Sequence, residues 1–598
     1  MARVFLTTLN AKFVHSSLAL RYLRAMISNT HEVVMDEFTI HDPAQHILGR
    51  IYEAAPDVIG FSCYIWNIEE IKRLLPLVKK IFPDTVIVLG GPEVSYETRE
   101  FMEANPSVDV VVIGEGEGSF RDFLAVLGDR TSWIRVPGIC FRNAQQVIER
   151  TGPGEKLVLD AVPSPYREDT MHELHQRIVY FEASRGCPFH CQFCLSSIED
   201  TVRYFSLDRV IDDLQRLIDA GVRQIKFVDR TFNLHKEYAI KIFEFLIQTK
   251  GITTFHFEIT GDILKPDIVQ WLCTNAPPGL FRFEIGVQST NDITNDIVQR
   301  RQNFTRLSET VRNIKESGRI LQHLDLIAGL PEEDYRSFQK TFDDVFALRP
   351  DELQLGFLKL LKGTGLRRMA DKFGYVFMDT APYEILSNHC LSFSDVLRLK
   401  YMEDILEKYY NSGWFKLTIE YLMRHCYESA FVFFQSFSEM WNSRGWSRIG
   451  HQPLDLVFRL RSFLQLEGFF DETLEILLHA DYLLREKLRP RNLWWDPEIS
   501  HGLQLHLVRS LLVENNQRIE LTDDRLFVKP HHLEKRIVID RAAIGAIPFL
   551  FPDVEIQDAK RYYLVYVYAA GAGTANVYLL HDQVVEERDD DWLMVVKP

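Results

Sequence analysis

The 598-residue sequence has few cysteines and no hydrophobic run long enough to span a bilayer. Its 8 cysteines provide no disulfide framework, which is typical of a protein from a reducing compartment. Low-complexity tracts and internal repeats are also absent, so nothing indicates a repeat array. The opening segment Met1–Leu6 is expected to lead into a strand rather than to act as a signal peptide. These absences favour a globular, cytoplasmic protein with no membrane partner.

Positive charge is also in deficit. Lys and Arg number 68 against 84 Asp and Glu, which gives a net charge of −16. A protein that mainly grips a phosphate backbone needs many Lys and Arg contacts, so nucleic acid is a disfavoured partner, although a local basic patch would still permit one. The length predicts about three to four domains at about 100–200 residues each.

One short loop carries most of the chemical information. Cys187, Cys191 and Cys194 follow the spacing C-x-x-x-C-x-x-C. Thiolates suit iron–sulfur clusters, and three of them leave one iron of a four-iron cluster without a protein ligand. Two other interpretations are part of a zinc site, with only His190 inside the loop as a fourth ligand, and one apolar face of a helix. Pro188 breaks a helix there, which favours the cluster.

The loop resembles the cluster loop of radical S-adenosylmethionine (SAM) enzymes. In that family, the amine and carboxylate of SAM chelate the open iron, and an electron from the cluster cleaves SAM to a 5'-deoxyadenosyl radical. The resemblance implies that Cys187, Cys191 and Cys194 are catalytic ligands of a 4Fe-4S cluster, and that Phe193 packs near the adenine of SAM. It also implies an external electron donor such as flavodoxin or ferredoxin.

Residues 177–370 alternate strand and helix in the manner of a partial (β/α)6 barrel, whose reacting face lies at the strand C-termini. Two of the expected helices are Asp208–Ala220 and Ser337–Leu348. The expected strands are Ile178–Glu182, Arg223–Val228, Thr254–Ile259, Phe281–Val287, Gln322–Ile327 and Glu352–Leu358.

The same resemblance assigns SAM-binding roles to polar residues at the strand ends. Asp229 and Arg230 occupy the family's slot for the methionyl ammonium and carboxylate, whose charges they complement. Glu258 and Asp262 occupy the positions that bind the ribose hydroxyls. The remaining implied SAM-binding residues, on later strands, are Glu284, Gln288 and Asp325.

Residues 1–135 read as a doubly wound, flavodoxin-like parallel sheet, because short apolar strands alternate with amphipathic helices. Asn67 is expected to cap one of these helices in a capping box with Glu70. Ligands of such sheets bind beyond the carboxyl ends of the strands. The expected strands are Arg3–Leu9, Val58–Tyr64, Thr85–Leu89 and Asp109–Ile113, and the expected helices are Ser16–Ser28, Ala44–Ala54 and Ile68–Phe82.

Glycine-rich loops follow these strands, and glycine lets backbone approach a bulky ligand closely. Beside the cysteine loop downstream, they resemble the cobalamin-binding domain of the cobalamin-dependent radical SAM enzymes, and Asn10–Ala19 resembles an opening found in that family. The cobalamin-binding residues that this resemblance implies are Asn10, Ser62, Cys63, Tyr64, Trp66, Asn67, Gly90, Gly91, Pro92, Glu93, Gly114, Glu115, Gly116 and Glu117.

The sequence departs from the D-x-H-x-x-G motif with which cobalamin mutases and methionine synthase place a histidine beneath cobalt. His46 follows Asp42 at the wrong spacing and is expected to be an ordinary helix residue. The resemblance therefore implies base-off cobalamin with no histidine ligand. Trp66 is the first choice for the residue beneath cobalt, and a helix-flanking core aromatic is the alternative.

The remaining segments of the sequence allow only a coarse prediction of their structure. The C-terminal part resembles an uncharacterised extension found in the same family. That extension is expected to cap the barrel or to serve as a dimerisation or partner surface. The expected parts are a linker at 136–176, a helical domain at 371–515 and a small strand-rich element at 516–598. Expected elements within them are helices at Val396–Ser412 and Asp471–Leu488, and strands at Arg561–Tyr568 and Asn576–Leu580 separated by Gly571–Thr574.

The leading functional hypothesis from the resemblance is a methyltransferase that acts on an unactivated carbon through a 5'-deoxyadenosyl radical and methylcobalamin. A cobalamin-dependent rearrangement, cyclisation or redox step without methylation is the first alternative. A non-catalytic cobalamin sensor would not need an intact cysteine loop. A methylthiotransferase would need a second cluster in the N-terminal region, which has only Cys63 and Cys140, so it is rejected. A peptide, a small metabolite and a modified nucleoside all remain open as the substrate.

Overall fold

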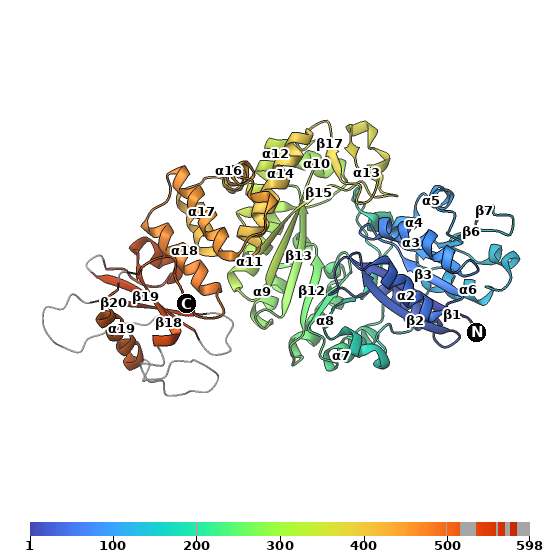
Figure 1. The fold of residues 1–598 in the computed structure, drawn as a ribbon, viewed down its shortest axis with the longest axis horizontal. Helices are drawn as coiled ribbons and strands as arrows, with labels where there is room; N and C mark the ends of the chain where they lie inside the picture. Colours follow the sequence, from blue (N-terminus) through green and yellow to red (C-terminus); the bar gives the residue numbers. More distant parts are fainter. Residues whose placement is uncertain (199–200, 498, 515–533, 558–559, 569–574, 583–598) are drawn as a thin grey trace. The chain divides into compact units, whose positions relative to one another are not determined.

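The computed structural model of the chain describes residues 1–198, 201–497, 499–514, 534–557, 560–568 and 575–582. They fall into two compact units, Met1–Val396 and Leu397–Pro598 (Figure 1). The first unit contains the sheet and the barrel predicted from the sequence, so the α/β fold class is confirmed. No helix in the described part of the chain has both the length and the apolar character needed to cross a bilayer.

A seven-stranded sheet with the order β2-β1-β3-β4-β5-β6-β7 forms the N-terminal part of the first unit. Apolar side chains cover both of its faces in separate core clusters, as expected for buried parallel strands. The parallel strands are β1 (Arg3–Asn10), β2 (Glu32–Thr39), β3 (Val58–Ser62), β4 (Val86–Gly90) and β5 (Val110–Val112). The helices are α1 (Leu18–Ile27), α2 (Ala44–Ala54), α3 (Ile68–Ile81), α4 (Pro92–Ser95), α5 (Thr98–Ala104) and α6 (Gly116–Ala125).

This sheet is larger than the sequence predicts. The edge strand β2 was not expected, because Glu32, Asp36 and Glu37 interrupt its apolar pattern. β6 (Ile139–Arg142) pairs with β5 in antiparallel fashion, β7 (Ile148–Arg150) pairs with β6 in the same way, and their buried side chains join the two core clusters. The predicted linker at 136–176 therefore begins too early.

Six parallel strands with the order β15-β14-β13-β12-β11-β8 form the partial barrel (Figure 1). Phenylalanines such as Phe257 and Phe283 cover one face and pack against Phe243 of α8, while charged residues occupy the alternate positions. The strands are β8 (Ile178–Phe181), β11 (Gln224–Phe227), β12 (Thr254–Ile259), β13 (Phe281–Gln288), β14 (Leu321–Ala328) and β15 (Glu352–Phe357), each within one residue of the prediction at either end. The main helices are α7 (Leu207–Asp219), α8 (Lys236–Gln248), α9 (Pro266–Asn275), α11 (Phe304–Ser317) and α12 (Tyr335–Phe346).

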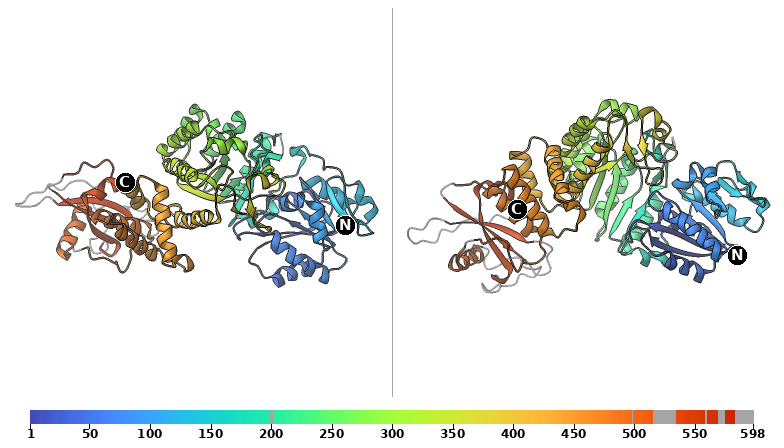
Figure 2. Two further views of the ribbon diagram at one scale, coloured as in Figure 1. Left: turned by 90° about the horizontal axis from the view of Figure 1, so that it is seen from above. Right: turned by 45° about the horizontal axis from the view of Figure 1, so that its top comes forward.

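The second unit combines helices with a three-stranded antiparallel sheet (Figure 2). Asp471 caps α18 (Glu472–Arg485), since its side chain accepts a hydrogen bond from the backbone N–H of Leu474. α18 and the sheet share one core cluster, so the predicted boundary at 515/516 does not separate two cores. The predicted Gly571–Thr574 connection lies outside the described residues. The elements are α14 (Phe393–Leu406), which crosses the boundary between the units, α15 (Lys416–His425), α16 (Ala430–Ser443), α17 (Pro453–Glu467), α18 (Glu472–Arg485), α19 (His501–Glu514), β18 (Ile537–Ala542), β19 (Arg561–Val567) and β20 (Asn576–Asp582).

Candidate functional site

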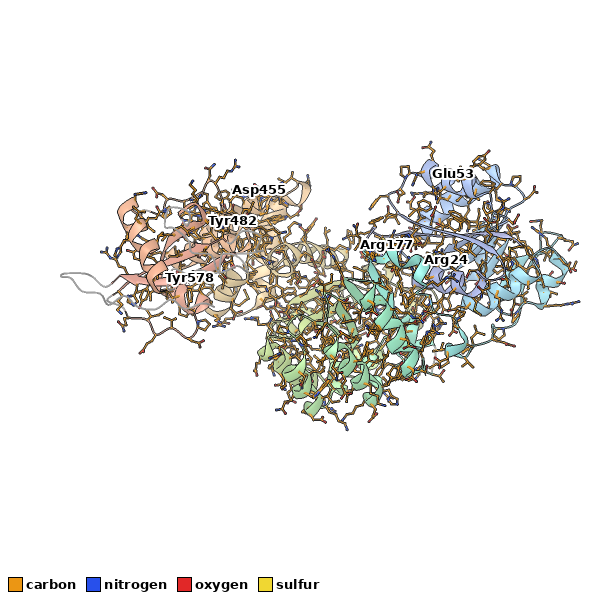
Figure 3. All side chains as sticks on the ribbon, turned by 90° about the horizontal axis from the view of Figure 1, so that it is seen from below. Arg24, Glu53, Arg177, Asp455, Tyr482 and Tyr578 are labelled. Atoms are coloured by element: carbon orange, nitrogen blue, oxygen red, sulfur yellow. The ribbon has the colours of Figure 1, made fainter. Side chains whose placement is uncertain are left out.

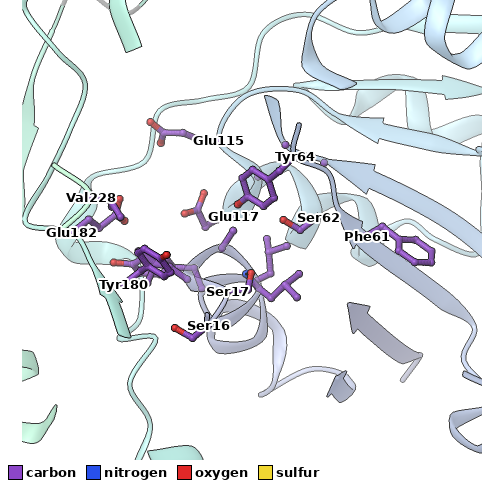
Figure 4. Close-up of a pocket in the computed structure, with 18 of the residues that line it drawn as sticks. Ser16, Ser17, Phe61, Ser62, Tyr64, Glu115, Glu117, Tyr180, Glu182 and Val228 are labelled. Atoms are coloured by element: carbon purple, nitrogen blue, oxygen red, sulfur yellow. The ribbon is translucent and has the colours of Figure 1, made fainter. Parts of the chain in front are cut away.

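A cavity of about 680 Å³ lies between the N-terminal sheet and the barrel, within the first unit (Figure 4). Loops that follow β1, β3, β4 and β5 form one wall, and residues at the carboxyl ends of β8, β11 and β12 form the other. Both parallel sheets thus present the ends at which such sheets bind ligands to the same space. The volume is within the range of small-molecule and cofactor sites.

The sheet wall contains most of the predicted cobalamin-binding residues. Trp66 is 46% exposed and stacks on Tyr64 with the ring centroids 4.5 Å apart. Of the predicted residues, the cavity is lined by Asn10, Ser62, Tyr64, Trp66, Gly90, Gly91, Gly114, Glu115, Gly116 and Glu117.

Apolar side chains that the sequence did not single out line the deeper part of this wall. Leu20 and Leu23 come from α1, Val88 and Val112 from the sheet, and Phe120 from α6. The sequence pattern at these positions predicts only ordinary core residues of strands and amphipathic helices. The sheet wall thus combines apolar side chains with glycine loops at which backbone groups are accessible to a ligand.

The remaining predicted cobalamin-binding residues, Cys63, Asn67, Pro92 and Glu93, do not line the cavity. Asn67 is fully buried and supports the loop after β3: its amide donates to the carbonyl of Ser62 and accepts from the backbone N–H of Tyr64. Its side chain therefore does not cap α3.

The predicted capping box is wrong for the same reason, and Glu70 pairs with Arg73 instead. His46 lies on α2 as expected, with its ring edge-on to Phe38 and away from the cavity.

Gly91 shows why glycine is needed in the loop after β4. Its φ of 110° lies in the region that L side chains avoid, and a Cβ there would overlap the carbonyl oxygen of Cys63. The backbone N–H of Cys63 also donates a 2.7 Å hydrogen bond to the carbonyl of Gly90. The loops after β3 and β4 are thus held against each other at the cavity wall.

The barrel wall contains two of the predicted SAM-binding residues, Arg230 and Glu258, which form an ion pair at 3.3 Å. The carboxylate of Glu258 raises the pKa of Arg230, and burial raises the pKa of Glu258. Such a pair can exchange its internal contact for the carboxylate and the hydroxyl or ammonium groups of a polar ligand.

Sequence reasoning missed several residues of this wall. Lys226 lies on β11, and Val228 and Arg230 follow at every second position beyond its end, so all three line the same wall. Strand periodicity was therefore a signal that could have found them. The other missed wall residues are Tyr180, Glu182 and Arg185 at the barrel and His15 in the loop after β1. The hydroxyl of Tyr180 lies 2.9 Å from Nδ1 of His15.

The same alternation turns Asp229 away from Arg230. Asp229 is 2% exposed, and its carboxylate accepts hydrogen bonds from the backbone N–H of Ala183 and the hydroxyl of Ser184. Burial raises the pKa of Asp229 to about 7. Asp229 thus supports the start of the cysteine loop, and the structure does not bring it together with Arg230 on the cavity wall.

The other predicted SAM-binding residues lie outside the cavity wall. Glu284 receives a 2.8 Å hydrogen bond from Lys226 and lies 2.9 Å from Nε2 of His256. Burial opposes ionisation of Glu284, but these two partners outweigh it and lower its pKa. Asp325 lies 3.0 Å from Nε2 of His323.

Three further predicted SAM-binding residues lie at positions where they support the fold. Asp262 accepts a 2.8 Å hydrogen bond from the backbone N–H of Asn303, just before α11. Gln288 ends β13 at a register shift, with φ of 69°. Phe193 packs against a core cluster at the end of the barrel.

The three motif cysteines lie on one loop with little exposure. Cys187 and Cys191 are 8% and 7% exposed, and Cys194 is half-buried. Burial raises the pKa of both Cys187 and Cys191, while Nη1 of Arg300, 4.0 Å from Sγ of Cys191, favours its thiolate. Within the described residues, no three His, Cys, Asp or Glu side chains are placed to hold a single metal ion. A cubane binds each thiolate through a different iron and does not require such convergence.

Three segments of the chain match models of known protein families. Residues 6–124 match the B12 binding domain, and residues 181–345 match the radical SAM superfamily. Residues 371–548 match a protein family of unknown function, DUF4080.

Two curated relatives each match about half of the chain. The cobalamin-dependent radical SAM methyltransferase TokK of Streptomyces tokunonensis is 29% identical over 321 residues, which cover 50% of this chain and 45% of that protein. An anaerobic magnesium-protoporphyrin IX monomethyl ester cyclase of Cereibacter sphaeroides is 21% identical over 334 residues, which cover 53% of each protein. The chain thus spans about half the length of these curated relatives.

The fold also resembles that of a solved structure. The cobalamin-dependent SAM radical enzyme OxsB, with aqua-cobalamin bound, aligns with a TM-score of 0.60 and 15% identity, over 80% of this chain and 81% of that one. At this identity the similarity concerns the fold.

Proposed function

The chain joins a B12-binding domain to a radical SAM domain, and on this premise we propose that it is a cobalamin-dependent radical SAM methyltransferase acting on an unactivated carbon. The observation that carries the proposal is the single cavity shared by the two domains. One wall consists of the predicted cobalamin-binding loops, and the other contains Arg230, Glu258 and the strand that leads into the cysteine loop. Two cofactors bound at these walls would face one substrate-sized space.

When bound, a 4Fe-4S cluster with SAM supplies a 5'-deoxyadenosyl radical, and cobalamin supplies a methyl group. Cys187, Cys191 and Cys194 would hold the cluster and leave one iron open for SAM. Arg230 and Glu258 would bind the charged and hydroxyl groups of SAM at the barrel wall. The cluster requires an external electron donor, for which flavodoxin or ferredoxin is our proposal.

On the sheet wall, Gly90, Gly91, Gly114 and Gly116 would let the edge of cobalamin approach the backbone. Trp66, supported by Tyr64, is our proposed neighbour of cobalt. Base-off cobalamin with no histidine ligand is part of this proposal, and it is supported by the position of His46, which lies on α2 and does not line the cavity.

A second candidate is a cobalamin-dependent reaction without methyl transfer. The similarity to the anaerobic cyclases, which extends over a similar share of this chain as the similarity to TokK, favours it. The substrate of either reaction is a peptide, a small metabolite or a modified nucleoside, met in the cytoplasm.

Anaerobic reconstitution followed by iron, sulfide and cobalt analysis tests the proposal. We expect about four irons and about one cobalt per chain for the wild type. Cys191→Ala should lose iron but keep cobalt, and Cys273→Ala, which changes a half-buried cysteine on α9, should keep both. Iron without cobalt in the wild type would overturn the proposal.

Deuterated methyl-SAM separates the two candidate reactions. Methyl transfer predicts that the deuterated methyl group first appears on cobalamin. It should then leave cobalamin as 5'-deoxyadenosine forms in the presence of substrate. Formation of 5'-deoxyadenosine with no label entering cobalamin supports the reaction without methylation.

A further inference from the structure

A small two-stranded ribbon closes the loop that carries the cysteines. β9 (Ser184–Arg185) pairs in antiparallel fashion with β10 (Arg203–Tyr204), so both ends of the loop meet at its base. Gly186 follows at once with φ of 100°, and a Cβ there would overlap the carbonyl oxygen of Thr201. The two ends of the loop are thus packed with no room for a larger residue.

The ribbon places two positive charges directly opposite each other. Arg185 and Arg203 are cross-strand partners in its register. Like charges in this position destabilise a strand pair. The isolated ribbon would therefore be opposed by its own side chains, and it needs negative charge from elsewhere.

That charge comes from the segment that follows β5 in the N-terminal domain, where Glu115 precedes α6 and Glu117 lies in its first turn. Arg185 forms ion pairs with Glu117 at 2.6 Å and with Glu115 at 3.3 Å, and Arg203 also pairs with Glu115. Glu182 at the end of β8 adds a third carboxylate, 2.7 Å from Arg185. The side chains of Arg185 and Glu117 are only 13% and 9% exposed, so solvent screens their pair weakly. In Figure 4, Glu115, Glu117 and Glu182 lie around the cavity.

The two carboxylates from the sheet have two roles at once, because Glu115 and Glu117 also line the cavity. Glu117 lies in the first turn of α6, and Glu115 immediately precedes that helix. A ligand that packs against Gly114 and Gly116 restricts the loop that presents both carboxylates. Filling the cavity is thereby linked to the base of the cysteine loop through direct contacts.

We propose that Arg185, Arg203, Glu115 and Glu117 form a clamp through which a cobalamin bound in the cavity orders the cysteine loop. This inference rests on the proposed function for the identity of the occupant. The four side chains are positioning residues: they act through the loop and not on the reacting atoms. The clamp makes the two cofactor sites energetically dependent on each other, and the coupling is reciprocal by linkage.

A second contact between the two domains offers a matched control. Arg177, which lies just before β8, pairs with Glu37 of β2 at 3.5 Å and donates to the carbonyl of His15 at 2.8 Å (Arg177 is labelled in Figure 3). It joins the same sheet to the same barrel as the clamp, but none of these contacts involves the ribbon. Arg177→Met therefore removes an inter-domain ion pair without changing the clamp.

Alkylation of the loop thiols in the iron-free, full-length chain tests the proposal. The rate of iodoacetamide labelling at Cys187, Cys191 and Cys194 is followed by mass spectrometry with and without hydroxocobalamin, with Cys273 as internal reference. In the wild type we expect hydroxocobalamin to slow labelling of the loop thiols by about fivefold or more, a usual coupling between linked sites. Arg203→Met and Glu115→Gln should lose this protection, whereas Arg177→Met and the conservative Arg203→Lys should keep it.

Each outcome bears on the clamp. The clamp would be overturned if hydroxocobalamin protected the loop thiols of Arg203→Met as well as those of the wild type. It would also be overturned if Arg177→Met lost as much protection as Arg203→Met. Failure of hydroxocobalamin to bind the wild type would overturn the proposed function. The clamp would then be tested by the labelling rates of the loop thiols in the ligand-free proteins. In that arm Glu115→Gln should label faster than both the wild type and Arg177→Met at the loop thiols but not at Cys273, and equal rates would overturn the clamp. Circular dichroism identifies any variant that does not fold, in which case Glu117→Gln, which weakens the pair with Arg185, replaces it in the comparison.

Discussion

The hydroxyl of Tyr383 donates a 2.8 Å hydrogen bond to the carboxylate of Glu93, a residue 290 positions earlier in the chain. Both side chains are almost fully buried, at 3% and 2% exposure. Glu93 lies in α4, directly after the cavity loop that contains Gly90 and Gly91. The segment that follows the barrel therefore supports the cavity wall from behind.

Removal of the Tyr383 hydroxyl should destabilise the first unit. In Tyr383→Phe, the carboxylate of Glu93 stays buried without its donor, which costs about 1–3 kcal/mol. Urea unfolding followed by tryptophan fluorescence measures this loss. Glu93→Gln keeps an acceptor for the hydroxyl and should lose less stability, so equal losses in the two variants would contradict the role given to the bond.

Gly91→Ala should disturb the cavity, because the new Cβ overlaps the carbonyl oxygen of Cys63 and φ is positive. We expect about 1–3 kcal/mol of lost stability and weaker binding of hydroxocobalamin, measured by absorbance titration. Gly49→Ala is the matched control, because Gly49 lies within α2 with no atom close to the added Cβ. That change should stabilise the chain by about 0.5–1 kcal/mol. Unchanged cobalamin affinity in Gly91→Ala would remove this loop from the binding site.

Arg300→Met should make Cys191 less reactive in the iron-free protein. Burial already raises the pKa of Cys191, and the nearby guanidinium opposes this rise. Without Arg300 the pKa rises further, so less thiolate is present at pH 8 and alkylation of Cys191 slows several-fold. Arg301→Met changes the exposed neighbouring cation and should have little effect. A faster reaction in Arg300→Met would show that Arg300 shields the thiol instead of activating it.

Asp481 should make the second unit less stable as the pH rises. Its buried carboxylate accepts from the backbone N–H groups of Leu417 and Thr418 at 3.0 and 2.9 Å, and burial raises its pKa to about 7. The unfolded pKa is about 3.9, so the folded state binds the extra proton between these values. The resulting stabilisation is complete below about pH 4 and declines by about 1.4 kcal/mol per pH unit until about pH 7. Asp481→Asn should flatten this part of the profile, measured by hydrogen exchange of α15 between pH 5 and pH 8. A slope equal to that of the wild type would assign the pH dependence to another group.

The sequence predicts the barrel strands closely because fully buried parallel strands read as short apolar runs bounded by turns. β2 escaped prediction for the opposite reason, since an edge strand tolerates Glu32, Asp36 and Glu37. β6 and β7 were assigned to a linker because nothing local reveals that β6 pairs with β5 and extends the sheet to β7.

A family resemblance predicts the loops that form the cavity more accurately than it predicts the individual side chains that line it. Asp229 and Arg230 are neighbours just beyond the end of β11, yet only Arg230 lines the cavity, while Asp229 accepts a hydrogen bond from the backbone N–H of Ala183. Asn67 follows a cavity loop, but its amide satisfies buried backbone groups. The pairing of Arg185 with Glu117, 68 positions apart, leaves no trace in either local sequence.

The order of synthesis gives the N-terminal sheet a further part in maturation. Every strand of that sheet ends by residue 150, whereas the first motif cysteine is Cys187. Domains fold as units during translation, from the N-terminus onward, so Glu115 and Glu117 can be in place before the thiols leave the ribosome. Iron–sulfur assembly on this chain then begins on a loop whose docking surface already exists.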